Sequence, residues 1–423
     1  MKTIAKIRAF LLPAASVLML SAAVAACSTG KDELTGNGYS SVSDFRLILR
    51  TTPLPIDSYK QILSFDAEGS WQLSTSADWL LLSFVGGQES DSEEGSAGSQ
   101  TLSGKGGKAV QLISLANPEE DSRTGQIIIK SGSKSAVLNV SQLGTSSGHI
   151  DTGGKPVLTA GWMELPETNA EDGLDAYTVR FSDNSRNYTF YWDYGTFVSN
   201  WVAYPLNSSL IGDYIARTNA WAYCPLLPAN KQSNVSRAYT NAYGQYYGYD
   251  RGHQLPSADR LGSFARNAQT FYGVNMTPQD DNFNSNIWAS VEGKVRALAT
   301  KTYTDTLYVV TGCVTTGATE FVYDASGNHV TIPTAYFKAV LLHEKSSSDL
   351  YAATGHYAAS AIWFDHAEYS QSGKYNESLT NEHSITVKEL EERLGYKLFV
   401  NLDAAIGAEK AEAVRTGNIQ WLK

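Results

Sequence analysis

The tetrapeptide Asp250-Arg251-Gly252-His253 is followed, further along the chain, by Asn284 and Glu292, which are eight residues apart. Eight residues make about two turns of an α-helix, so on a helix these two side chains would share a face. We expect such a helix from about Ser285 to Thr300, with Trp288 packing it against the core. The pattern thus sets out a base, an arginine, an amide and a carboxylate for one region of the fold.

These four groups are what a metal-assisted phosphodiester hydrolase needs. His253 has a reference pKa of about 6.5, so it can take a proton from water near neutral pH. Arg251 offers a permanent charge and a planar set of donors to a phosphate. Asn284 has an amide oxygen of the kind that Mg²⁺ accepts, and because Mg²⁺ keeps several waters, one protein ligand is chemically reasonable. Glu292 would accept hydrogen bonds from those waters.

The order of the motifs resembles the DNA/RNA non-specific endonuclease family, which is endonuclease G-like and has the ββα-metal fold. The motifs are Asp-Arg-Gly-His at 250–253, Asn-x-x-Pro-Gln at 275–279 and Asn-x-x-x-Trp-x-x-x-Glu at 284–292. Trp-Val-Ala-Tyr at 201–204 and Ile-Pro-Thr-Ala-Tyr-Phe-Lys at 332–338 also fall in the family's order. The resemblance covers roughly residues 156 to 423.

The resemblance implies a role for each site residue. The expected catalytic residues are His253 as general base, Glu292 beside the metal's waters, Arg251, Arg217 and Asn275. The expected metal ligand is Asn284, for Mg²⁺ or alternatively Mn²⁺. The expected substrate-binding residues are Arg251, Arg217 and Gln279.

The resemblance also implies hydrolysis of DNA and RNA to give 5′-phosphate ends, with little sequence preference because the contacts go to the backbone. One alternative is a surface-anchored glycan-binding protein in which the nuclease fold is an inactive scaffold. Another is an enzyme that acts on a different phosphodiester. The acidic pair Asp280-Asp281 departs from the expected pattern, since a neutral or basic residue would better suit a polyanion.

The formal net charge of −10 is unfavourable for a protein that binds nucleic acid, because phosphate contacts need Lys and Arg. The distribution of charge matters more than the sum. Residues 211–301 contain nine basic and six acidic residues, an excess of three positive charges around the motifs. The sequence is therefore consistent with a basic cleft on an acidic protein.

The N-terminus resembles a bacterial lipoprotein signal. A positive segment with Lys2, Lys6 and Arg8 precedes an apolar stretch that ends in small residues before Cys27. We expect residues 1–26 to be a signal peptide, Cys27 to be lipidated, and residues 27–43 to be a flexible tether. The alternative is an uncleaved anchor helix. The expected location is the bacterial cell envelope, lipid-anchored to the outer membrane and either periplasmic or surface-exposed.

Residues 44–145 alternate apolar and polar residues in short runs separated by turn residues, a pattern that predicts a small all-β sandwich. Its Ser-Ala-Asp-Trp-Leu segment at 76–80 and its closing Val-Ser-Gln-Leu-Gly at 140–144 resemble the BACON module of bacterial envelope proteins. Carbohydrate is a candidate partner for such a module, with Trp79 as a candidate platform for a sugar. Residues 146–155 are the expected linker.

The fold class expected for residues 156–423 is α+β, a ββα-metal nuclease domain with a central antiparallel sheet. Strands are expected near residues 188–192, 201–205, 306–312 and 335–342, and a second helix from Val387 to Gly395. Cys224 and Cys313 remain once Cys27 is lipidated. In an oxidising compartment they are candidates for a disulfide.

Overall fold

The computed structural model describes residues 38–84, 98–144, 161–180 and 185–422, with short gaps inside these ranges. The expected signal peptide, Cys27 and the linker 146–155 lie outside the described residues. In the described part of the chain, no helix combines the length and the apolar character needed to cross a bilayer.

The N-terminal strands form two antiparallel sheets that enclose one core, as expected for a small β-sandwich. One sheet has the order β1-β2-β3-β7-β5 and the other β6-β4-β8-β9. Inward-facing residues alternate with exposed ones along β8 and β9, and Trp71, Ile127 and Leu138 are among the buried residues. The strands are β1 (Gly38–Val42), β2 (Leu47–Thr52), β3 (Tyr59–Phe65), β4 (Ser70–Thr75), β5 (Leu80–Phe84), β6 (Thr101–Lys105), β7 (Lys108–Ser114), β8 (Arg123–Ser131) and β9 (Lys134–Gln142).

Two details of this sandwich differ from expectation. Strand β1 lies within residues 27–43, so part of the expected tether is paired with β2. Trp79 is 7% exposed, and the guanidinium of Arg123 lies 4.4 Å from its ring centroid. A ring that is buried and covered by a cation offers no open face, so the role of Trp79 as a sugar platform is wrong.

The C-terminal part is built on a seven-stranded sheet of order β10-β11-β12-β15-β18-β19-β20, in which every neighbouring pair is antiparallel. Its central strands confirm the four predicted ones. The strands are β10 (Asp175–Arg180), β11 (Arg186–Asp193), β12 (Val198–Leu206), β15 (Thr304–Val314), β18 (Ala335–Glu344), β19 (Tyr357–Asp365) and β20 (Ser384–Ile385). A separate hairpin pairs β16 (Phe321–Tyr323) with β17 (His329–Thr331).

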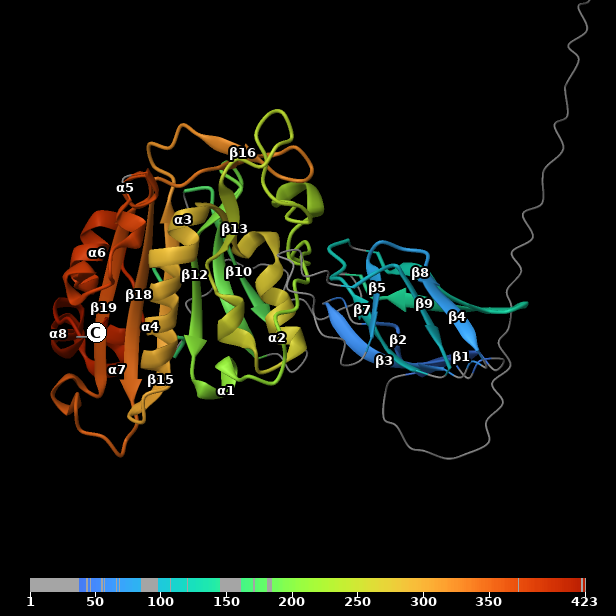
Figure 1. Cartoon of the computed structure of the whole chain (residues 1–423). Helices are drawn as coiled ribbons and strands as arrows, with labels where there is room; N and C mark the ends of the chain where they lie inside the picture. Colours follow the sequence, from blue (N-terminus) through green and yellow to red (C-terminus); the bar gives the residue numbers. More distant parts are fainter. Residues whose placement is uncertain are drawn as a thin grey trace, which may run out of the picture. The chain divides into compact units, whose positions relative to one another are not determined.

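Both faces of this sheet are buried. Along β18, Tyr336, Val340 and Leu342 belong to one apolar core, whereas Phe337, Ala339 and Leu341 belong to a second. The period of two carries successive side chains to opposite faces. Helix α4 (Ala289–Ala299) contributes to the first core, and α6 (Val387–Leu394), α7 (Leu402–Ile406) and α8 (Ala408–Thr416) contribute to the second (Figure 1).

The remaining helices are short. They are α1 (Ser208–Ile211), α2 (Phe264–Ala268), α3 (Asp281–Phe283) and α5 (His366–Gln371), together with η2 (Ala229–Lys231), η3 (Ser257–Arg260), η4 (Gln269–Phe271), η5 (Gly273–Asn275), η7 (Ala352–Thr354), η8 (Lys374–Asn376) and η9 (Asn381–His383). The predicted second helix is α6, which ends at Gly395 in the left-handed conformation with φ 78°. Glycine favours this conformation because it has no Cβ.

A compact ββα unit carries the motif residues. Strand β13 (Tyr249–His253) pairs antiparallel with β14 (Met276–Asp280), and the chain then continues through α3, the π-helical turn η6 (Asn284–Trp288) and α4. Asp280 caps this helical segment by accepting from the backbone N–H groups of Asn282 and Phe283. The acidic residue that departs from the family pattern thus has a structural reason, because a carboxylate at an N-cap satisfies otherwise unpaired donors.

The candidate disulfide between Cys224 and Cys313 is not formed. The two thiols are buried and are not joined to each other. The Sγ of Cys313, on β15, donates to the backbone oxygen of Ser199 at 3.4 Å. At Cys224, the side chain of Gln232 bonds both the backbone N–H and the backbone oxygen. Each residue is held by a neighbouring segment, which leaves the pair as separate core residues.

Gly312 and Gly293 give a matched test of packing in this fold. A Cβ at Gly312, near the C-terminal end of β15, would lie 2.2 Å from the Phe337 ring and 2.4 Å from the Asn200 oxygen, whereas nothing lies within 4 Å of a Cβ at Gly293 in α4. We expect Gly312→Ala to lower the free energy of unfolding by about 2 kcal/mol or more and Gly293→Ala to raise it by about 1 kcal/mol. Urea denaturation measures both, and equal effects of the two substitutions would contradict the packing described.

Candidate active site

The ladder between β13 and β14 sets the directions of the motif side chains. His253 is opposite Met276 and Arg251 is opposite Pro278. Since alternate residues of a strand face the same side, Arg251 and His253 share one face of the hairpin. Gly252 faces the other, where a Cβ would lie 2.0 Å from the Gln279 side-chain oxygen. Glycine is therefore required between the arginine and the histidine so that Gln279 can fill this space.

His253 is a buried imidazole among aromatic rings. It is 8% exposed, and its ring centroid lies 4.9 Å from that of Phe271 and 5.8 Å from that of Trp221. Burial, reinforced by the positive charges of Arg217 and Arg251, holds the pKa of His253 well below its usual value of 6.5. Its Nε2 has no hydrogen-bond partner in the described residues. His253 is thus neutral near pH 7 and able to accept a proton, as a general base requires.

The structure brings the two predicted arginines to the same place. The guanidinium carbon of Arg251 lies 3.7 Å from the Trp221 ring centroid, and its Nη1 donates to the backbone oxygen of Val235 at 2.7 Å. Arg217 is exposed and lies 5.0 Å from the Phe271 centroid. Arg217 and His253 both pack on the Phe271 ring, and both arginine charges act on His253, so the predicted Arg217 lies near the base.

Asn284 is oriented by Asp250, a residue to which the sequence reasoning gave no role. The Nδ2 of Asn284 donates to the Oδ2 of Asp250 at 2.9 Å. Because a carboxylate only accepts, this bond fixes which end of the amide is nitrogen and leaves the oxygen end for another partner. The sequence did point to this residue, because Asp250 is the first position of the Asp-Arg-Gly-His motif.

The π-helical turn changes the angle between Asn284 and Glu292. On a regular α-helix, eight residues rotate by about 800°, which is about 80° more than two turns. A π turn takes up one extra residue, so the rotation becomes about 700°, only about 20° short of two turns. The turn spans Asn284–Trp288, between the two site residues. The expected common face therefore depends on this irregularity, which the spacing alone did not reveal.

Glu292 lies over a group of buried charges. Its side chain is 17% exposed, and its Oε2 is 4.0 Å from Nη1 of Arg296, which in turn contacts Oδ1 of Asp259 at 3.0 Å. Burial raises the pKa of Glu292 and is the largest effect. The positive charge of Lys338 lowers this pKa, but the net result is a pKa above the usual value. Arg296, one turn beyond Glu292, is a site residue that the sequence reasoning missed, although the four-residue spacing could have indicated it.

Lys338 is the buried cation of this group. It is 0% exposed, its Nζ donates to Thr311 Oγ1 at 2.6 Å, and it lies 5.0 Å from the Trp288 ring centroid. Burial lowers the pKa of Lys338, while the charge of Glu292 opposes that change. An ammonium group inside a protein is costly unless it is balanced, so Lys338 and Arg296 together balance Glu292 and Asp259.

Two predicted site residues are buried. Asn275 is fully buried, and its side chain donates to the backbone oxygens of Leu255 and Thr270 and accepts from the Leu255 N–H. The prediction that Asn275 is catalytic is wrong, because all its groups hold the loop that follows β13. Gln279 is 1% exposed and packs over Gly252. Gln279 thus lies behind the Arg251–His253 face, and its role as a substrate-binding residue stays a prediction.

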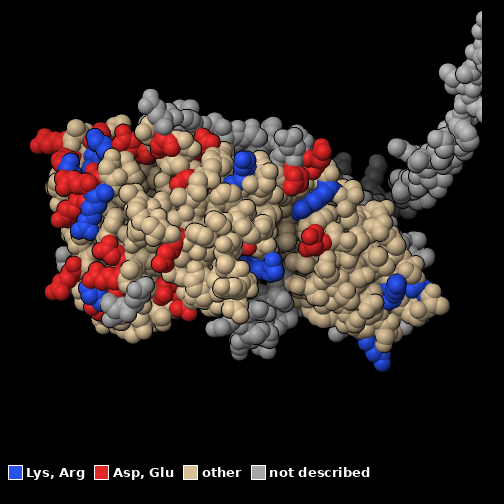
Figure 2. Space-filling view, turned by 90° about the horizontal axis from the view of Figure 1, so that it is seen from above, with Lys and Arg blue, Asp and Glu red and all other residues tan. Residues whose placement is uncertain are grey.

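Charge and shape at the surface add two observations. On the face shown in Figure 2, the described Lys and Arg residues form no continuous patch.

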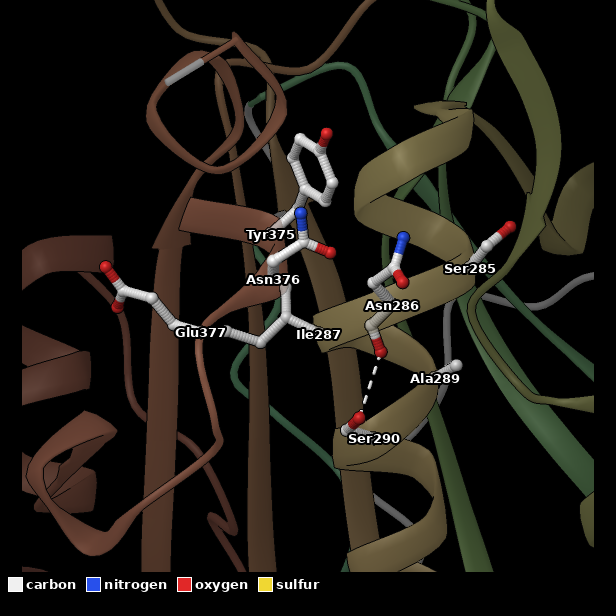
Figure 3. A pocket seen from close by; sticks show the side chains of 8 residues that line it. All are labelled: Ser285, Asn286, Ile287, Ala289, Ser290, Tyr375, Asn376 and Glu377. Atoms are coloured by element: carbon white, nitrogen blue, oxygen red, sulfur yellow. Dashed lines mark hydrogen bonds between the residues drawn. The ribbon is translucent and has the colours of Figure 1, made fainter. Parts of the chain in front are cut away.

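A cavity of about 390 Å³ lies between the helical segment, at Ser285, Asn286 and Ser290, and the Tyr375–Glu377 stretch (Figure 3). None of the predicted site residues lines this cavity. It therefore lies apart from the chemistry inferred above.

Comparison with known families matches two parts of the chain. The model of the DNA/RNA non-specific endonuclease family matches residues 166–405. The BACON model matches residues 69–143. These matches fall on the two regions for which the sequence indicated these resemblances.

Curated relatives are nucleases. The chain is 29% identical to a nuclease of Nostoc sp. over 211 residues, which is 49% of this chain and 69% of that protein. It is 28% identical to a nuclease of Serratia marcescens over 48% of this chain and 69% of that protein. It is 33% identical to mitochondrial endonuclease G of Bos taurus over 41% of this chain but only 55% of that protein. A chain from a crystal structure of an EndoG/EndoGI complex aligns with TM-score 0.41 and 19% identity, covering 54% of this chain and 88% of that one.

The buried charges predict a pH-dependent effect of Lys338→Met. Glu292 gains a proton as the pH falls and then no longer needs a counter-charge, so the loss of stability should be small at pH 5 and larger at pH 8. Urea denaturation at the two pH values measures it. Thr311→Val is the control, because it keeps the Lys338 charge and removes the hydroxyl that bonds Lys338 and Tyr204, which should cost about 1–3 kcal/mol at both pH values. A pH-independent loss in Lys338→Met would show that Lys338 contributes packing alone.

Proposed function

The chain belongs to the DNA/RNA non-specific endonuclease family, hydrolases that act on nucleic acids, and from this premise we propose that it cleaves phosphodiester bonds of both DNA and RNA, leaving 5′-phosphate ends. The observation that carries the proposal is the state of His253. A neutral imidazole with an unpartnered Nε2, placed beside two arginines, is equipped to activate water next to a phosphate.

The residues around Asn284 fit a divalent cation, which we propose to be Mg²⁺, with Mn²⁺ as the alternative. Asp250 holds the amide so that its oxygen is available, and Glu292 adds a carboxylate two turns along the helix. In the described residues no cluster of three His, Cys, Asp or Glu side chains could hold a metal. One amide ligand with retained waters suits Mg²⁺. A bound cation would supply charge stabilisation to the phosphate and the leaving oxygen.

Each residue then has a defined task in the reaction. His253 takes the proton of the water that attacks phosphorus. Arg251 and Arg217 bind the phosphate oxygens, where negative charge increases during the displacement. Glu292 accepts hydrogen bonds from water beside Asn284 and so orients it. Since these contacts go to the backbone, the base sequence should matter little.

We further propose that Cys27 is lipidated after removal of residues 1–26 and that the enzyme is tethered in the bacterial cell envelope. The support is the sequence pattern described above. The substrate would then be DNA and RNA in the periplasm or outside the cell. The alternative function, a glycan-binding protein with an inactive nuclease scaffold, leaves the neutral buried His253 without a use.

Digestion of plasmid DNA and of RNA by the protein tests the proposed function. We expect cleavage with Mg²⁺, none with EDTA, and a loss of at least about 10²-fold in His253→Ala, because general-base catalysis is typically worth 10²–10⁴-fold. His343→Ala, which changes a histidine paired with Asp305 at the surface, should keep its activity. A folded wild-type protein that cleaves neither substrate would favour the scaffold alternative, and binding to glycans would then be measured.

Replacing Asp250 by alanine tests the orientation of Asn284. Without its acceptor the amide can rotate, so we expect the affinity for Mn²⁺, measured by calorimetry, to fall by about 10- to 100-fold. Asp281→Ala is the matched control, because both carboxylates accept from the Tyr246 hydroxyl but only that of Asp250 accepts from the Asn284 side chain, whereas Asp281 contacts Asn284 through its backbone oxygen. Equal losses in the two variants would mean that net charge, and not orientation, sets the affinity.

A further inference from the structure

Trp221 stands at the centre of the groups assigned to phosphate binding and proton transfer. Its ring lies 3.7 Å from the guanidinium carbon of Arg251 and 6.0 Å from that of Arg217. The same ring is 5.8 Å from that of His253 and meets Phe271 edge to face at 4.8 Å and 90°. No motif of the sequence singled out this residue.

The backbone around Trp221 is fixed to the core. The N–H of Ala222 donates to the Phe271 oxygen, and the N–H of Gly273 donates back to the Ala222 oxygen. Phe271 itself is fully buried. Trp221 is half-buried, so one part of the ring belongs to the core and another lines the site. The core therefore fixes the position of the Trp221 ring, unlike a loop side chain that is surrounded only by solvent.

We propose that Trp221 is a positioning residue, whose ring holds the Arg251 guanidinium in place and shields His253 from water. A guanidinium stacks on an aromatic face because it is planar and weakly hydrated, and it keeps its edge donors available to a phosphate. The side chain thus acts through the arginine and the histidine. This inference rests on the proposed function, because it assigns those two residues their tasks.

Removing the ring should change two measurable properties. Trp221→Leu retains both arginines, so the slope of log KM against log salt should stay the same. The value of kcat should fall by about tenfold or more, because the phosphate-binding group loses its fixed position. The pKa of His253 should rise towards 6.5, since burial is the main cause that lowers it, whereas the positive charges of Arg217 and Arg251 remain in the variant.

Two matched variants separate positioning from general packing. Trp221→Phe keeps an aromatic face and should retain most of the activity. Trp363→Leu removes another half-buried tryptophan, which lies under the Arg393 guanidinium at 5.5 Å and packs against the second core. It should lower the melting temperature without altering kcat or the pH profile. If Trp221→Leu behaves in the same way, Trp221 only packs the core and the inference is wrong.

The titration of His253 by NMR gives a readout that does not need activity. A rise in its pKa in Trp221→Leu, together with an acid limb of kcat/KM moved to higher pH, supports the inference. An unchanged pKa overturns the shielding role, even if the wild-type protein cleaves nucleic acid. Absence of cleavage by the wild-type protein would contradict the proposed function, and in that case the NMR titration alone still decides whether Trp221 shields His253.

Discussion

The hydrogen bond between Asn284 and Asp250 joins the helix of the ββα unit to its first strand, and the candidate site depends on it. Asp250 lies three residues before His253 on β13, so a single ladder fixes both the base and the acceptor that orients the amide. The helix is fixed in turn by Asp280, the last residue of β14 and the cap of the helical segment. The ten paired residues of β13 and β14 therefore fix the positions of His253, of the Asn284 amide and of the start of the helix.

Beneath this unit, a set of mutually balanced charges holds the Glu292 carboxylate where little water reaches it. Glu292 and Asp259 are balanced by Arg296 and Lys338, which come from the same helix and from the central sheet. Such a group adds little net stability, because desolvation offsets much of the attraction. Its value lies in function. A carboxylate whose pKa is raised by burial responds strongly to an added positive charge, as a divalent cation would supply.

The sequence predicted most of what depends on local pattern. Strand periodicity located the four central strands, and the spacing of motif residues located His253, Arg251 and Asn284. It failed where side chains from distant segments decide the outcome. Asn275 shares a motif with the site, yet its amide is used entirely by neighbouring backbone. Lys338 and Trp221 enter from a sheet strand and a loop, and no spacing rule connects either to His253 or Glu292. Cys224 and Cys313 were candidates for a disulfide because they are the two cysteines that remain beside Cys27, but the sequence did not give their positions in the fold.

The π-helical turn has a consequence for comparing this chain with its relatives. The π turn at Asn284–Trp288 contains one residue more than a turn of α-helix. The number of residues between two positions therefore no longer gives the angle between their side chains around the helix axis. A relative that lacked one residue here could present the same amide and carboxylate side by side on an uninterrupted α-helix. Equivalent residues in this family are therefore to be matched by the direction of their side chains, since a gap placed by sequence alone would pair residues on different sides of the helix.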